Sequence, residues 1–262
     1  MKDVTLLGPA APEIGWVPAP RYVLRRRRIL RQLRDVLPCG VLEIGCGAGM
    51  LLQELAAIGF HCTALESSPQ ARDCAERISS TTGRAIELHA EPKSDWAGRF
   101  PLVMAFEVLE HIEDDIQALR AWASWLSPGG TLLISVPAHP SQWNAADEWA
   151  GHFRRYRAKD LVRLIAEVGL SIEHFDCLGF PLGNLTEKLQ ARAIRKEQRN
   201  DGLIDRAANN ARSGVDRDHV MRWYPLMKSP PGQLALRCAL AAQAMSSRLP
   251  LGNGFLLRAR AR

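Results

Sequence analysis

Three glycines and an acidic residue stand where a parallel sheet would place a ligand. Gly45, Gly47 and Gly49 directly follow a short β-type run, 40–44. Glycines in such a turn let the backbone bend tightly and let a ligand approach the main chain closely. Glu66 ends the next β-type run, where a carboxylate can accept hydrogen bonds from two neighbouring ribose hydroxyls. Together these residues predict a binding site for a cofactor that contains a ribose.

The spacing of the glycines separates two classes of cofactor. The dinucleotide fingerprint is Gly-x-Gly-x-x-Gly, whose third glycine packs a helix against a strand beneath a pyrophosphate. This chain has Gly-x-Gly-x-Gly instead, with no glycine in 50–52 and with Glu43 two residues before the first glycine. The pattern therefore disfavours an NAD-dependent oxidoreductase.

Three segments together resemble a known family. Residues 43–49 resemble motif I of the class I S-adenosylmethionine-dependent methyltransferases. Residues 106–111 resemble the fourth-strand end of small-molecule methyltransferases, including those of ubiquinone biosynthesis, and residues 126–135 resemble their Pro-Gly-Gly turn and fifth strand. The resemblance covers roughly residues 35–178 and the closing strand. It implies an enzyme that uses S-adenosylmethionine, releases S-adenosylhomocysteine and methylates an oxygen or nitrogen of a small-molecule or lipid-linked acceptor, anionic acceptors included.

The resemblance also implies which residues bind the cofactor. The glycine loop would line the methionine part and the ribose, Glu43 would hold that loop or the amino group, and Glu66 would bind the ribose hydroxyls. Glu91 matches an acidic position that contacts adenine, although an ordinary surface acid is the alternative. The family often has Asp where this chain has Pro101, so we expect the entry of the fourth strand to differ. The implied cofactor-binding residues are Glu43, Gly45, Gly47, Gly49, Glu66, Glu91 and Glu107.

Histidines are the candidates for removing a proton from the acceptor. Because the cofactor brings its own leaving group, the protein mainly positions the acceptor and takes up its proton. A histidine titrates near neutral pH, so His111 and His152 are the predicted catalytic residues. His139 and Asp147 are further candidate bases. The alternative for His111 is a residue that caps the following helix or packs over the cofactor.

The segment 147–156 is the expected acceptor-binding loop. It resembles a Gly-His-x-Arg-Arg-Tyr signature in one branch of these methyltransferases, often associated with cell-surface or lipid-linked metabolites. Guanidinium groups match carboxylates and phosphates, so the two arginines suit an anionic acceptor. The alternative is that they pair with nearby acids and order the loop. The predicted acceptor-binding residues are Trp143, Arg154, Arg155 and Tyr156.

Metal ligands do not cluster along the sequence. The six cysteines are scattered, with no Cys-x-x-Cys pair and no compact group of histidines beside them. We therefore expect neither a disulfide framework nor a metal site.

The elements that position these residues alternate between strand and helix. Such alternation indicates βαβ units. We expect an α/β, Rossmann-like fold with a seven-stranded, mainly parallel sheet, helices on both faces and a helical insertion before the last strand. Residues 127–130 are expected to form a turn and 22–37 an amphipathic helix. The predicted strands are 40–44, 60–65, 85–89, 102–106, 131–136, 171–177 and 255–259.

The chain divides by pattern into four parts. An N-terminal lead-in with a basic amphipathic helix precedes the cofactor-binding core and the helical insertion, and the closing strand ends the chain. The insertion has a polar middle, 200–217, and would form a lid over the acceptor or contact an anionic membrane. The four parts are 1–37, 38–179, 180–250 and 251–262.

The net charge of +6 is concentrated in arginines near the start of the chain and in the insertion. Arginine-rich helix faces are mostly solvated, and that is the interpretation we adopt. A nucleic-acid methyltransferase is the first alternative function. It is disfavoured because 106–109 lacks the Asn/Asp-Pro-Pro-aromatic turn of base-modifying enzymes. A non-catalytic, cofactor-binding regulatory protein is the second.

The expected location of the protein is the cytoplasm, with peripheral contact to the inner face of the membrane as an option. The N-terminus lacks the pattern of a signal peptide, and no apolar run reaches the ~18 residues of a membrane span.

Overall fold

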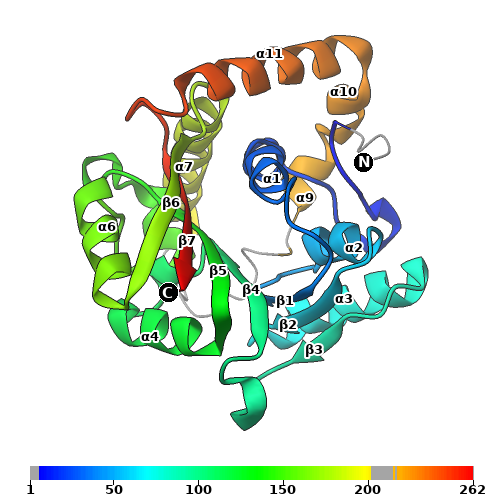
Figure 1. The fold of residues 1–262 in the computed structure, drawn as a ribbon. Helices are drawn as coiled ribbons and strands as arrows, with labels where there is room; N and C mark the ends of the chain where they lie inside the picture. The colour runs from blue at the N-terminus through cyan, green and yellow to red at the C-terminus, as the bar shows by residue number, and fades with distance from the viewer. Residues whose placement is uncertain (1–5, 202–214, 216, 262) are drawn as a thin grey trace.

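The central element of the fold is one sheet of seven strands in the order β3-β2-β1-β4-β5-β7-β6. The computed structural model describes residues 6–201, 215 and 217–261. Strands β1 to β5 run parallel, whereas β7 pairs antiparallel with both β5 and β6. The predicted fold class is confirmed (Figure 1). The strands are β1 (Gly40–Ile44), β2 (His61–Leu65), β3 (Glu87–His89), β4 (Phe100–Phe106), β5 (Leu126–Pro137), β6 (Leu170–Leu178) and β7 (Gly254–Ala261).

Helices cover both faces of the sheet. In Figure 1, α4 and α6 lie on one side and α1, α2 and α3 on the other. The helices of the core are α1 (Pro20–Gln32), α2 (Met50–Ala56), α3 (Pro69–Thr82), α4 (Asp115–Trp125), α5 (Ala145–Ala150) and α6 (Ala158–Glu167). The described helices of the insertion are α7 (Leu182–Asp201), α9 (Asp218–Met221), α10 (Tyr224–Lys228) and α11 (Pro230–Ser246).

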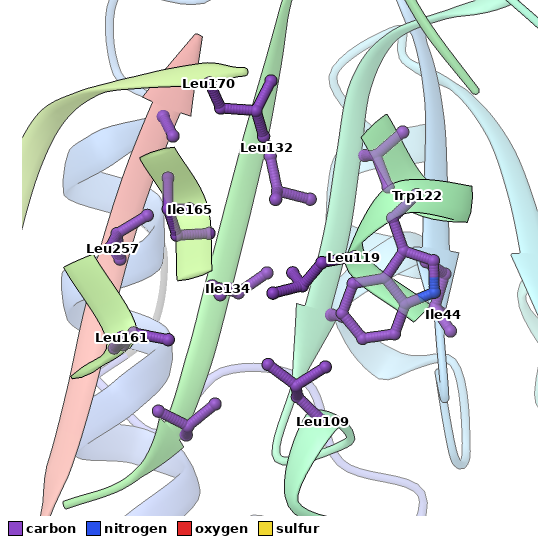
Figure 2. Packing of buried hydrophobic residues seen from close by; sticks show 14 of the residues in the cluster. Ile44, Leu109, Leu119, Trp122, Leu132, Ile134, Leu161, Ile165, Leu170 and Leu257 are labelled. Carbon is purple, nitrogen blue, oxygen red and sulfur yellow. The ribbon is translucent and has the colours of Figure 1, made fainter. Parts of the chain in front are cut away.

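Side chains of the central strands point alternately to the two faces of the sheet and form a hydrophobic core on each face. Neighbouring side chains of a strand point to opposite faces, so Leu132 packs with α4 and α6 whereas Leu133 packs with α1 and α2. Figure 2 shows the first core, where Leu119 of α4 and Ile165 of α6 approach Ile134 of β5. With both faces buried, the central strand β4 is wholly apolar, whereas β6 and β7 nearer the sheet edge carry charged residues.

The insertion packs on the N-terminal helix. Both α7 and α11 contact α1, and α7 also contacts α5. Figure 1 shows α11 crossing the molecule above α1 before the chain returns to β7. Much of the predicted polar middle of the insertion, 202–214 and 216, lies outside the described residues. Among the described helices, none is both long and apolar enough to cross a membrane.

Most strand bounds differ from the predicted ones by one or two residues, and three differences have a clear structural basis. Helix α1 ends at Gln32 instead of residue 37, because Leu33 is the last fully buried side chain of this segment and Leu37 is exposed. Strand β3 is shorter than expected, since it lies at the sheet edge and pairs only with β2. The predicted turn 127–130 lies inside β5 as an irregularity in its pairing with β4.

Two arginines of α1 are buried instead of solvated. Arg26 pairs with Glu54 of α2, and the Arg28 Nε lies 3.0 Å from the Asp176 Oδ2 of β6. Both guanidinium groups lie in the interior. The expectation of a solvated basic face is therefore wrong at these two positions.

Candidate functional site

The glycine loop and Glu66 are joined by hydrogen bonds at the carboxyl ends of β1 and β2. The Gly47 N–H donates to Glu66 Oε2 and the Ser68 N–H donates to Glu66 Oε1, each at 2.9 Å. Gly45 has a φ of 66°, and a Cβ added there would lie 2.5 Å from a methyl carbon of Val108. Only glycine fits that position. The close packing of the loop on Val108 therefore requires glycine at position 45.

Glu43 is a buried acid beneath this loop. Its Oε2 has no hydrogen-bond partner among the residues that the structure describes. Burial raises the pKa of Glu43 to about 8, with Arg25 lowering it and Glu66 raising it further. An unpartnered buried oxygen is costly, so Glu43 is suited to a positively charged or hydrogen-bonding ligand group.

Glu107 follows β4 in a strained backbone conformation. Its φ of 58° is unusual for a residue other than glycine, and such strain concentrates at functional sites. The Ser135 hydroxyl donates to Glu107 Oε1 at 2.8 Å, and guanidinium nitrogens of Arg25 and Arg21 lie 3.5 and 3.7 Å from the carboxylate. Burial disfavours the charged form, but the two arginines and the hydroxyl outweigh it and hold the pKa of Glu107 below its usual range.

A small cavity opens beside Glu107. Its lining includes Arg21 and Arg25 of α1 together with Gly179 and Asn253. The cavity therefore joins the end of β4 to the N-terminal helix and to the segments that flank the insertion. The charged groups that line it are the positive Arg21 and Arg25 and the negative Glu107.

A second group of polar side chains joins the turn after β4 to the loop after β5. Glu110 is fully buried, and neither of its carboxylate oxygens has a hydrogen-bond partner in the described part of the chain. The rings of His111 and His152 meet edge to face, with centroids 4.6 Å apart. His152 Nδ1 lies 2.9 Å from Asp147 Oδ1, and His152 Nε2 lies 3.9 Å from Glu110 Oε1.

Burial shifts the pKa values of His111 and Glu110 in this group. It lowers the pKa of His111 to about 4, with His152 lowering it further and Glu107 raising it. Burial and then the charge of Glu107 raise the pKa of Glu110 well above its usual range. Both side chains therefore favour their neutral forms.

Arg155 lies in a buried ion-pair network. Its Nε donates to both oxygens of Asp147 at 2.8 and 2.9 Å, and its Nη2 pairs with Glu187 of α7. Glu187 also accepts from the side-chain amides of Asn144 and Asn253. The network ties the loop after β5 to α7 and to the start of β7.

The other predicted acceptor-binding residues differ in exposure. Arg154 forms an ion pair with Asp115 at 2.7 Å and donates to the carbonyl oxygen of Glu113. Tyr156 is buried and donates to Asp115 at 3.0 Å. Trp143 is partly exposed.

Comparison with known proteins identifies the family. A profile of the Methyltransferase domain family matches residues 21–174. The chain belongs to this methyltransferase family. The resemblance to the class I S-adenosylmethionine-dependent methyltransferases is thereby confirmed.

Relatives and solved structures agree with this assignment. A ubiquinone biosynthesis O-methyltransferase of Xanthomonas campestris pv. campestris is 35% identical over 100 residues, which are 37% of this chain and 42% of that protein. The match therefore spans less than half of that relative.

Two solved structures share the fold at low sequence identity. A Galdieria sulphuraria protein proposed to be a sarcosine dimethylglycine methyltransferase has a TM-score of 0.60 at 14% identity, over 98% of this chain and 93% of that one. Phosphoethanolamine N-methyltransferase 2 of Haemonchus contortus, solved with S-adenosyl-L-methionine, has a TM-score of 0.55 at 15% identity. This match covers 90% of this chain and 52% of that one.

Several predicted site residues of this methyltransferase lie at one edge of the sheet. The structure brings Glu43, the glycine loop, Glu66 and Glu107 to the carboxyl ends of β1, β2 and β4. It places His111 and His152 in contact with each other. Glu91 lies exposed after β3. His139 packs edge to face on Phe255, with ring centroids 5.2 Å apart.

Four residues that the structure places in or beside the site were not predicted from the sequence. Arg21 and Arg25 stand four residues apart, a spacing that puts them on one face of α1 and beside Glu107. Glu110 stands within the motif 106–111, but its burial depends on contacts that only folding creates. No signal in the sequence links Glu187 to Arg155, since they lie on different elements.

Proposed function

We propose that this methyltransferase transfers a methyl group from S-adenosylmethionine to an oxygen of a small-molecule acceptor. The observation that carries the proposal is the arrangement of the glycine loop, Glu43 and Glu66 at the ends of β1 and β2. The similarity to a ubiquinone biosynthesis O-methyltransferase supports oxygen as the acceptor atom.

The residues of the loop fit this cofactor. Gly45 and Gly47 have positive φ values, so the loop turns tightly at the carboxyl end of β1, where its main chain can approach a ligand closely. Glu66 would accept from the ribose hydroxyls, and the unpartnered oxygen of Glu43 would accept from the amino group. Glu91 would contact the adenine. When bound, the cofactor supplies a methyl group already activated on a sulfonium.

Residues beyond β4 and β5 would handle the acceptor. His111 and His152 would lie on the acceptor side, and a neutral histidine can take up a hydroxyl proton. Trp143 and Arg154 are partly exposed, so they remain candidates for contact with the acceptor.

Two predicted acceptor contacts fit a positioning role better. The donors of Arg155 are taken by Asp147 and Glu187, and Tyr156 is buried against Asp115. We infer that both residues order the loop, which is the alternative weighed for the arginines above. An anionic acceptor would then meet Arg21 and Arg25, which line the cavity beside Glu107.

Binding measurements test the cofactor assignment. Calorimetric titration with S-adenosylhomocysteine, NAD and RNA should give binding with the first alone, which separates the proposed function from an oxidoreductase and from a nucleic-acid methyltransferase. Glu66→Gln should weaken binding by on the order of 1.5–3 kcal/mol for each hydrogen bond lost to a charged group. Glu76→Gln, on the exposed face of α3, is the matched control.

The activity itself needs a separate experiment, because a regulatory protein would also bind the cofactor. Incubation of the protein and labelled S-adenosylmethionine with fractionated extract, followed by mass spectrometry, should identify an O-methylated small molecule. Tight binding without label transfer to any fraction would favour the regulatory alternative.

We also propose that a lipid-linked acceptor would bring the protein to a membrane surface. Leu185 and Leu189 are exposed on α7, and the basic side chains of Lys188 and Arg192 lie close to them in the helix. An apolar strip flanked by basic residues suits an anionic membrane. Sedimentation with anionic vesicles, but not with neutral ones, would support this contact, and Leu185→Glu should abolish it.

A further inference from the structure

The segment before α1 folds back onto the glycine loop. It makes a tight turn in which the Ala11 N–H donates to the Trp16 carbonyl oxygen at 2.9 Å. The buried side chain of Trp16 packs in one hydrophobic cluster with Ala48 and Met50, which flank the last glycine of the loop. Tyr22, in the first turn of α1, joins the same cluster. The rings of Trp16 and Tyr22 meet edge to face, with centroids 5.2 Å apart.

Each of these two aromatic side chains has a polar atom without a partner. The indole Nε1 of Trp16 and the hydroxyl oxygen of Tyr22 are buried and have no hydrogen-bond partner in the described part of the structure. Burial raises the pKa of Tyr22, with a further contribution from Glu54, so the hydroxyl keeps its proton and remains a donor. Buried donors without acceptors are rare because each costs free energy. Two such donors on contacting rings point to a ligand group that accepts two hydrogen bonds.

We propose that Trp16 and Tyr22 bind the carboxylate of the amino-acid part of S-adenosylmethionine. The two oxygens of a carboxylate can each accept from a separate donor. Hydrogen bonds to a charged acceptor are also stronger than those between neutral groups. This inference rests on the proposed function, since it adds two residues to the proposed cofactor site.

Glu43 would supply the complementary half of this recognition. Its unpartnered Oε2 is an acceptor among the described residues. Its charge adds to the effect of burial in raising the pKa of Tyr22, so the two side chains lie within electrostatic reach of each other. The amino-acid part of the cofactor carries an ammonium and a carboxylate on one carbon. An acceptor and two donors beside the glycine loop therefore match both charged groups.

Trp16 lies outside the segment that the family profile matches, which begins at residue 21. The motif residues of the loop therefore do not imply its role. The assignment depends instead on the packing of the N-terminal segment against Ala48 and Met50. The competing explanation is that the aromatic pair only packs α1 against the loop and that a buried water molecule accepts from the two donors.

Binding of two related compounds to the full chain tests the inference. Decarboxylated S-adenosylmethionine keeps the adenosine, the sulfonium and the amino group and lacks only the carboxylate. In calorimetric titrations, S-adenosylmethionine should bind the unmodified protein more tightly than the decarboxylated compound. Tyr22→Phe and Trp16→Phe should each weaken binding of S-adenosylmethionine by about 10-fold or more, because each removes a hydrogen bond to a charged group. Neither substitution should change the affinity for the decarboxylated compound.

Matched controls lie at the start of α10. Trp223→Phe and Tyr224→Phe make the same chemical changes away from the loop and should leave the affinity for both compounds unchanged. The melting temperature without ligand provides a second readout. Tyr22→Phe should keep it, because the hydroxyl has no partner to lose in the free protein. A lower melting temperature with unchanged affinity for S-adenosylmethionine would indicate a bridging water molecule instead.

The outcomes separate this inference from the proposed function. Unchanged binding of S-adenosylmethionine by Tyr22→Phe, or an equal loss for both compounds, would overturn the inference and leave packing as the role of the pair. Tyr22→Phe keeps the ring, so it decides the case in which Trp16→Phe does not fold. If the folded, unmodified protein binds neither compound, the proposed function itself fails, and titration with S-adenosylhomocysteine would show the same result.

Discussion

Two glutamates at the ends of neighbouring strands have opposite surroundings. Glu66 accepts two backbone N–H groups and is satisfied before any ligand binds. Glu43 has one oxygen without a partner in the described structure, and its pKa is raised to about 8. The sequence predicted both as site residues from the motif. It did not predict this difference, because the difference depends on burial and on hydrogen bonds between separate loops.

The raised pKa of Glu43 has a consequence for stability. Between its ordinary pKa of 4.5 and about 8, native Glu43 keeps a proton that the unfolded chain releases. The free energy of unfolding should therefore fall as pH rises through this window and level off above it. Glu43→Gln removes the titration, so the variant should gain stability relative to the unmodified protein as pH rises. Urea unfolding at about pH 5 and about pH 9 measures the difference. The raised pKa of Glu43 would be contradicted if the stability difference between Glu43→Gln and the unmodified protein did not change with pH, or if Glu76→Gln gave the same change.

At the scale of elements, the loop after β5 is ordered by polar contacts more than by apolar packing. Helix α5 begins with a capping box, in which Asn144 and Asp147 satisfy each other's backbone N–H groups. Asp147 also binds Arg155 and His152. One carboxylate therefore connects the start of α5, the buried Arg155 and His152.

The two adjacent arginines of this loop provide a matched pair of substitutions. Arg155→Ala leaves Asp147 and Glu187 buried without their partner, and breaking such a pair costs about 3–5 kcal/mol. Arg154→Ala breaks an ion pair that is partly exposed to solvent, so the cost should be smaller. Thermal unfolding of both variants checks this order. If Arg155→Ala keeps its melting temperature and loses only turnover, the earlier expectation of direct acceptor contact would be restored.

The elements were predictable where local pattern decides them. Strands β1, β2, β4 and the glycine loop follow from apolar runs and turn residues, and their order brings the motif residues to one edge of the sheet. The length of β3 was overestimated, because an edge strand with one neighbour is limited by pairing that a local pattern does not contain. The ion pairs of α1 were missed for a similar reason. Arg26 meets a partner 28 positions away, and Arg28 meets one 148 positions away.

For the whole molecule, α1 connects parts that are distant in sequence. Its apolar residues pack under the sheet, its arginines reach the site at Glu107, and Arg28 pairs with Asp176 of β6. The same guanidinium donates weakly to Ser247, directly after α11, at 3.4 Å. The N-terminal helix, the sheet and the insertion therefore meet at one buried ion pair.

Removing one partner of that ion pair should destabilise the whole methyltransferase. Asp176→Asn leaves the Arg28 charge buried and uncompensated, at a cost of about 3–5 kcal/mol. At about 2–4 °C per kcal/mol, the melting temperature should fall by roughly 6–20 °C. Asp73→Asn is the control, since its pairing with Arg77 is exposed at 3.9 Å and should contribute at most about 1 kcal/mol. The double variant Arg28→Met with Asp176→Leu should recover much of the loss, because an apolar pair of similar volume often replaces a buried ion pair without cost. A melting temperature that Asp176→Asn leaves unchanged would mean that α1 is held by its apolar contacts alone.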